Sequence, residues 1–229
     1  EAPKKIFHYE MIDSVGFISK TAVTPSGTIF NATDDKTLVS EGDTVYLRPG
    51  DGPPLTAGEL YTIYRTFEVK TGLLTENSPG IQHYLTGVVE VTEIQPKYAI
   101  AKVVKSFRDI HYEDMVMPLK KRSQDIELKE AMDGLTGRII RSEERNALIG
   151  QYKLVFIDKG KNDGVEIGQS YHILHQPVAA PEPGAEPIGL KPITVGEILV
   201  LHTEDTTATG LITASTKTIK PDDKVRSPK

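Results

Sequence analysis

Histidine is the residue type in this chain most suited to acid–base chemistry or metal binding, because the 229 residues include no Cys. Only two of the six histidines, His172 and His175, lie close together in the sequence. They fall in a predicted strand, where residues three apart point to opposite faces. One metal ion could therefore bind both only at a bulge, and we expect no metal site there. The other four are His8, His83, His111 and His202.

A calcium loop is the next possibility, in the run from Asp158 to Gly164. The helix–loop–helix calcium site needs Gly at its sixth position and Glu at its twelfth. These positions hold Asp163 and Gln169, and two lysines stand among the would-be ligands. The run therefore indicates a turn between strands, with Asp-Gly supplying the positive φ.

No other pattern indicates catalysis. The carboxylate pairs Glu143-Glu144 and Asp222-Asp223 are adjacent in sequence, and we expect them to be solvated with no raised pKa. The phosphate-binding Gly-x-x-x-x-Gly-Lys-Ser/Thr motif and the Gly-x-Ser-x-Gly elbow are both missing. The lack of Cys removes disulfides, thiolate zinc sites and cysteine nucleophiles. We predict a protein that is not an enzyme, with no catalytic, metal-binding or cofactor-binding residues.

The net charge and the hydropathy of the chain argue against further classes of protein. The formal net charge of −5 argues against a nucleic-acid partner, which calls for a basic surface. No apolar run approaches the roughly 20 residues of a transmembrane segment. No signal-peptide pattern is visible, and the chain begins at Glu1 rather than Met. We therefore expect a processed or shortened form of a longer protein.

Short strands are the elements that must position these residues. Alternating apolar residues or short apolar runs, separated by Gly and Pro, predict most of the strands. Short closing strands are expected at Val116 and Val225. The main predicted strands are Val15–Ser19, Thr44–Leu47, Leu60–Arg65, Val88–Glu93, Tyr98–Val104, Gly137–Arg141, Lys153–Ile157, Ser170–His175, Glu197–Leu201 and Thr209–Thr213. One helix is expected over Asp125–Met132, with Ser123 as its cap and Gly134 after its end.

An internal repeat links the two halves. Residues 45–65 align with 155–175 at an offset of 110, and residues 87–118 align with 196–227 at an offset of 109. The alignment has 12 identities in 53 positions, and most apolar positions stay apolar. A duplication explains this spacing more simply than chance similarity does. Each half then has about six strands, enough to close into a small barrel without exposed edges.

The predicted fold class is therefore all-β, with two tandem six-stranded β-barrel-like domains from an internal duplication, joined by a short helix. We place the first domain at residues 1–118, the linker with its helix at 119–134 and the second domain at 135–229.

A long connection interrupts each half at the point where the offset changes. The second, rich in proline, reads as an extended arm. The first is apolar, and two interpretations stay open for it: a hairpin packed on the other half, or a surface that binds a partner. The predicted partner-binding residues are Phe67, Val69, Leu73, Leu74, Ile81, Tyr84 and Leu85.

Several runs together resemble a known family. These are Val15-Gly16-Phe17-Ile18, Glu41 to Leu47, Tyr61 to Arg65, Leu154 to Gly160, and Gly196-Glu197-Ile198 through to Pro228. They are similar to the region that follows the LysM module in proteobacterial envelope proteins of the type IV pilus secretin-associated, TsaP-like kind. Gly42-Asp43-Thr44 echoes the opening of a LysM module, but the two helices of that module do not follow.

The resemblance implies a non-enzymatic scaffold or interaction region in the periplasm or cell envelope. Its protein partner would be an outer-membrane secretin or a similar complex. Peptidoglycan would be bound only by a LysM module upstream of Glu1. Two alternatives stay open: a carbohydrate module that binds peptidoglycan itself, and an enzyme with a site between the two barrels. The aromatic composition, 9 Tyr and 6 Phe with no Trp, argues against the carbohydrate module.

Overall fold

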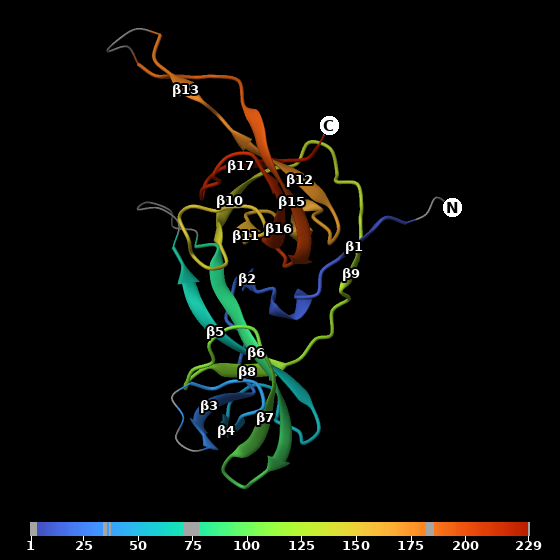
Figure 1. Ribbon diagram of the computed structural model, residues 1–229, viewed down its shortest axis with the longest axis vertical. Coiled ribbons are helices and arrows are strands. Elements are labelled where there is room, and N and C mark those ends of the chain that lie inside the picture. The colour runs from blue at the N-terminus through green and yellow to red at the C-terminus, as the bar shows by residue number, and fades with distance from the viewer. Residues whose placement is uncertain (1–3, 34–35, 37, 71–77, 182–185, 229) are drawn as a thin grey trace.

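The chain folds into two β-barrels stacked along the long axis of the molecule (Figure 1). The computed structural model describes residues 4–33, 36, 38–70, 78–181 and 186–228. Strands dominate these residues, and the only helical elements among them with defined bounds are two short 3-10 helices, η1 (Ile12–Ser14) and η3 (Lys161–Asp163). No helix in the described part has the length and apolar character needed to cross a membrane.

The first barrel closes through antiparallel pairing of six strands in the order β3-β4-β7-β6-β5-β8. A seventh strand, β2 (Phe17–Ser19), adds to the outer part of β6. The six barrel strands are β3 (Gly27–Ala32), β4 (Thr44–Pro49), β5 (Leu60–Val69), β6 (Gly80–Ile94), β7 (Ala99–Ser106) and β8 (Met115–Pro118).

The second barrel is closed by six strands in the order β10-β11-β16-β15-β12-β17. Two further strands, β13 (Val178–Ala179) and β14 (Ile188–Gly189), pair with each other on an arm that leaves the barrel between β12 and β15. The barrel strands are β10 (Thr136–Ser142), β11 (Leu154–Ile157), β12 (Ser170–His175), β15 (Ile193–Thr203), β16 (Ala208–Ser215) and β17 (Lys224–Arg226).

The two barrels match strand for strand, which confirms the predicted tandem fold. Val45 lies opposite Ala101 in the first barrel, and their counterparts Val155 and Gly210 lie opposite each other in the second. Even the irregularities recur. The paired register shifts fall at Ile29/Asn31 and Ile139/Arg141, Ile63/Tyr64 and Ile173/Leu174, Val88/Val89 and Glu197/Ile198, and Val91/Glu93 and Val200/His202. Bulges bend strands and increase their twist, so the same bulges give the same barrel shape.

Alternating strand residues fill both interiors. Ile29, Val45 and Ile63 are fully buried in the first barrel, and equivalent residues fill the second. Gly87 and its counterpart Gly196 lie where two backbones approach closely. A Cβ atom on Gly87 would lie 2.5 Å from the Lys105 carbonyl oxygen, so a side chain there would force the strands apart. The repeated glycines are thus required by packing.

The predicted helix over Asp125–Met132 is wrong. Asp125–Glu127 is instead strand β9, which pairs antiparallel with β1 (Ile6–His8). Ile126 is 5% exposed, whereas Leu128 and Met132 are 39% and 58% exposed. Of these three apolar residues only Ile126 is buried, so the apolar spacing that suggested a helix does not form a buried stripe. Strand β9 and loops, not a helix, form the connection, and β1 of the N-terminal segment pairs with β9.

Candidate functional site

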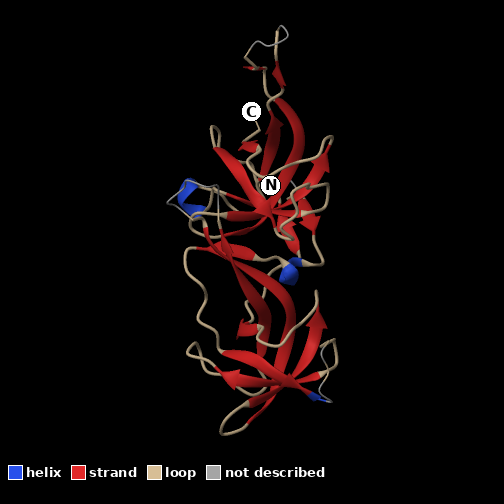
Figure 2. Cartoon of the chain, turned by 90° about the vertical axis from the view of Figure 1, so that its left-hand side faces the viewer, coloured by secondary structure: helices blue, strands red, loops and turns tan. Residues whose placement is uncertain are grey.

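The junction between the barrels brings together residues from distant parts of the sequence. Strands β5 and β6 continue beyond the first barrel as a hairpin, and β2 lies beside it as a third strand (Figure 1). Figure 2 shows from another side that strands run from one barrel toward the other. The far end of this hairpin packs against the second barrel, where Val69 and Ile18 meet Phe156 and Ile140. The first long connection is therefore a hairpin arm folded onto the other half.

Most of the predicted partner-binding residues lie on this hairpin. Val69 and Leu85 are both 1% exposed, because each is covered by other parts of the same chain. Phe67 packs edge-on against Tyr84 at 5.9 Å between ring centroids, and the Arg145 guanidinium lies 3.8 Å from the centre of the Phe67 ring. Ile81 is partly exposed, while Leu73 and Leu74 lie outside the described residues. Contact of this set with a separate partner stays a prediction.

Arg108 is at the centre of the polar contacts across the junction. Its Nη2 donates to the Glu143 carboxylate at 2.7 Å, and its Nε donates to Glu144 at 3.0 Å. Its Nη1 donates to the backbone oxygens of Ser14 and Leu85 at 3.1 and 2.6 Å. One guanidinium thus joins the first barrel, the N-terminal segment and the second barrel through charge-assisted hydrogen bonds.

Glu143 is buried, so the expectation that both members of its carboxylate pair are solvated is wrong. Its side chain is 1% exposed, and its second oxygen accepts a hydrogen bond from the Gly16 N–H at 2.6 Å. Burial raises the pKa of Glu143 to about 7, although Arg108 and Gly16 both favour the charged form. Burial opposes the charge on Arg108 too, but Glu143 and then Tyr84 and Glu144 raise the Arg108 pKa. Each of the two charges is therefore stabilised by the other, because burial removes most of the solvent that would otherwise stabilise it.

Neutral hydrogen bonds complete the junction. Thr207 and Thr209, on the second barrel, donate to the backbone oxygens of Ile18 and Gly16 at 2.6 and 2.8 Å. The Gln82 amide donates to the Glu143 backbone oxygen at 2.8 Å. All of these groups are buried, so losing one partner would leave an unsatisfied polar atom.

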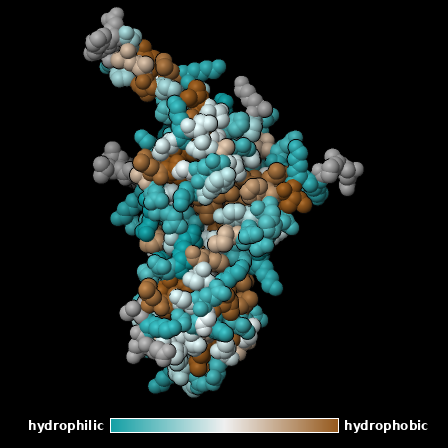
Figure 3. Space-filling model, in the orientation of Figure 1, coloured by the Kyte–Doolittle hydropathy of each residue, from teal (hydrophilic) through white to brown (hydrophobic). Residues whose placement is uncertain are grey.

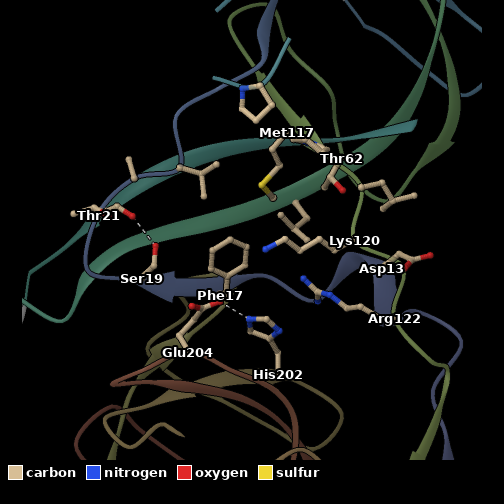
Figure 4. Close-up of a pocket in the computed structure, with 16 residues that line it drawn as sticks. Asp13, Phe17, Ser19, Thr21, Thr62, Met117, Lys120, Arg122, His202 and Glu204 are labelled. Atoms are coloured by element: carbon tan, nitrogen blue, oxygen red, sulfur yellow. Dashed lines mark hydrogen bonds and ion pairs between the residues drawn. The ribbon is translucent and has the colours of Figure 1, made fainter. Parts of the chain in front are cut away.

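A cavity of about 460 Å³ opens beside this junction and is lined from both barrels. Figure 4 shows Phe17 at its centre, Lys120 reaching across toward the Phe17 ring, and His202 with Glu204 on the second-barrel side. The Arg122 guanidinium lines it as well, but Nη1 donates to the backbone oxygens of Ile12 and Val15. Arg122 therefore holds the N-terminal segment in place.

His202 and Glu204 form the closest acid–base pair in the cavity, with 2.7 Å between Nε2 and Oε1. Burial lowers the pKa of His202, outweighing the hydrogen bond to Glu204. Burial alone would raise the pKa of Glu204, yet the hydrogen bond and the charge interactions with His202 and two lysines lower it. The two side chains therefore share one short contact, and the pKa of each lies below its ordinary value.

Ser19 and His202, which both line the cavity, each bond to another residue. The Ser19 hydroxyl donates to the Thr21 backbone oxygen at 2.7 Å, and the structure gives His202 no hydrogen bond to a hydroxyl. Among the residues that the structure describes, no three His, Asp or Glu side chains gather closely enough to hold a metal ion. His172 and His175 lie apart from the cavity on β12, and Asp163 of the supposed calcium loop pairs with Lys159 at 3.0 Å. The lining of this cavity is mainly apolar, and its charged or titratable groups are Asp13, Lys120, Arg122, His202 and Glu204.

Sequence reasoning missed the residues that matter most at the junction, namely Arg108, Glu143, Phe17 and His202. The repeat carried a usable signal for Glu143 and His202. Glu143 aligns with Thr33, and His202 aligns with Glu93, so the chemistry changes at these positions while the barrel interiors stay alike. A scan of protein-family models and a search of curated proteins match nothing to this chain.

Proposed function

We propose that the chain is a non-enzymatic scaffold region of a periplasmic cell-envelope protein. It would bind a protein partner, an outer-membrane secretin or a similar complex, while a LysM module upstream binds peptidoglycan. The resemblance described under Sequence analysis supplies the partner and the compartment. No nucleic acid or cofactor takes part in this proposal.

The buried polar junction between the barrels is the observation that supports a scaffold best. Arg108 is 17% exposed and Glu143 is 1% exposed, and their contact joins the two barrels with the N-terminal segment between them. Buried polar contacts with full partners favour one arrangement over alternatives. A scaffold that sets the spacing between two envelope components benefits from such a fixed relation between its barrels.

The test is retention of a purified secretin, in detergent, on the immobilised 229-residue chain. Saturable binding is expected for the native chain. Arg108→Met, which loosens the junction, should weaken binding, while Arg48→Met should not, since the Arg48–Glu113 pair is exposed on the first barrel. No retention by the native chain would contradict the proposal.

A carbohydrate-binding role has one observation in its favour. Phe30, Tyr46 and Tyr98 form an aromatic cluster on the outer face of the first barrel, with ring centroids 5.8 to 6.4 Å apart. Their ring planes are inclined by 48° to 73°, whereas a sugar-stacking platform needs a flat face. Sedimentation with purified sacculi decides the question: retention of the native chain, lost in Tyr98→Ala, would establish carbohydrate binding in place of the scaffold role.

A further inference from the structure

The two barrels carry equivalent hairpins that end in different surroundings. In the first barrel β5 and β6 extend as a hairpin whose end is covered by the second barrel. In the second barrel the equivalent strands, β12 and β15, lead into the arm that contains β13 and β14. This arm points away from both barrels (Figure 1).

The arm has an unusual number of exposed apolar side chains for its size. Val178, Ile188, Leu190 and Ile193 are 63%, 55%, 47% and 42% exposed. Figure 3 shows this hydrophobic surface on the arm at one end of the molecule. Exposed apolar side chains that lie together in this way indicate a surface that contacts another molecule, whereas single exposed apolar residues do not.

The first hairpin shows what kind of surface such an arm fits. It packs with the N-terminal segment on the outer face of β10 and β11, where Ile140 and Phe156 lie, and Thr207 lies directly before β16 on the same side. Phe156 is fully buried there, although its side chain points out of its own barrel. The burial comes from Val69 of the hairpin and Ile18 of the N-terminal segment.

The repeat identifies the equivalent face on the first barrel. At the same offsets, Ile140, Phe156 and Thr207 correspond to Phe30, Tyr46 and Tyr98, the members of the aromatic cluster. Nothing in the described chain packs over this face as the hairpin does over Phe156, and Phe30 is 39% exposed. The cluster lies on β3 and β4 and directly before β7, at the end of the molecule opposite the arm (Figure 1).

We propose that the arm of one copy of this chain docks on the aromatic cluster of a second copy, and that copies associate head to tail. The contact repeats, between molecules, the hairpin-on-barrel packing already present within one molecule. A chain cannot make this contact with itself, because its arm and its cluster lie at opposite ends. The two surfaces differ, so the contact is heterologous and adds copies until a ring closes or a filament forms.

The test uses three surface variants whose side chains are exposed, so that folding is preserved. The arm variant is Val178→Asp with Ile188→Asp, and the cluster variant is Phe30→Asp. The control is Leu148→Asp, at a 67% exposed leucine outside both surfaces. Circular dichroism checks the fold, and Phe30→Ala replaces Phe30→Asp if the latter melts early.

Sedimentation velocity over a concentration series measures the association. The native chain and the control should grow beyond the 25.2 kDa monomer as concentration rises. The arm and cluster variants should each need at least about tenfold higher concentration, which corresponds to 1.4 kcal/mol. A native chain that stays monomeric up to about 1 mM, a concentration that detects even the weakest specific contacts, overturns the proposal.

Mixing the two variants distinguishes head-to-tail association from other modes. The arm variant keeps an intact cluster and the cluster variant keeps an intact arm, so one good contact remains and the mixture should stop at two chains. If arms pair with arms, the cluster variant associates normally and the mixture gains nothing, which refutes the proposal. Unchanged association of both variants assigns the contact to another surface and also refutes it. None of these outcomes depends on secretin binding.

Discussion

Replacing Arg108 with Met tests the physical basis of the junction most directly. The substitution removes four hydrogen bonds and leaves the Glu143 carboxylate with only the Gly16 N–H. Breaking a buried pair by removing one partner costs about 3–5 kcal/mol of unfolding free energy. We expect this loss at pH 8, measured by urea unfolding followed by circular dichroism.

The same variant should be less destabilised at pH 5. Burial already holds the pKa of Glu143 near 7, above its ordinary value, so the folded state binds a proton more tightly than the unfolded state does. The stability contributed by Glu143 is thus full at low pH and is lost as pH rises through 7. Without Arg108 the pKa rises further, and each unit adds about 1.4 kcal/mol to the cost at high pH.

Two comparisons make this prediction refutable. Arg108→Met combined with Glu143→Gln should recover part of the loss, since no buried charge then lacks its partner. The matched control Arg48→Met removes an exposed pair and should cost less than about 1 kcal/mol. Equal destabilisation at pH 5 and pH 8, or a double variant no more stable than the single one, would refute the reasoning.

Three further predictions concern buried groups of the junction. Burial lowers the pKa of His83 to about 4, so the free energy of unfolding should fall by about 3 kcal/mol as the pH drops from 6.5 to 4. An acid titration of His83→Gln should lack this dependence on pH. Gly16→Ala would place a Cβ atom too close to the His83 backbone oxygen and should lower the free energy of unfolding by about 1–3 kcal/mol. A Cβ atom at Gly150 would meet open space, so equal melting temperatures for Gly16→Ala and Gly150→Ala would contradict this prediction. Thr209→Val should cost about 1–3 kcal/mol in urea unfolding because the Gly16 oxygen loses its donor, and Thr213→Val, on a weaker 3.4 Å bond, should cost less.

The barrels could be predicted because the strand pattern depends on neighbouring residues and is present in both halves of the chain. Alternation along Leu60–Arg65 and Ser170–His175 gave strands, and the constant offset paired them. The segment 125–132 shows the limit of such reasoning. In so short a run the apolar spacing fits both a helix and a strand, and contacts with distant residues decide. Here the pairing of Ile126 with Phe7 and its burial selected the strand.

The junction was beyond prediction because its energetics depend on pairs far apart in the chain. Adjacent Glu143 and Glu144 look alike in sequence, yet one is buried and the other is 41% exposed. Only docking of the barrels brings Arg108 between them. The predicted partner-binding residues were found as an apolar group by composition, but composition could not tell that Val69 and Leu85 are covered by the chain itself.

The N-terminal segment at the junction also sets an order of assembly during synthesis. Gly16 and Ile18 find their hydrogen-bond partners in Thr209 and Thr207, 193 and 189 residues later. Contacts of such long sequence separation form late, because the intervening chain must first be made and placed. The first barrel can close while the ribosome is still working, but the N-terminal segment beside it stays uncovered until Thr207 and Thr209 have been made. A chain cut short before Thr207 would therefore leave the backbone oxygens of Gly16 and Ile18 without these donors.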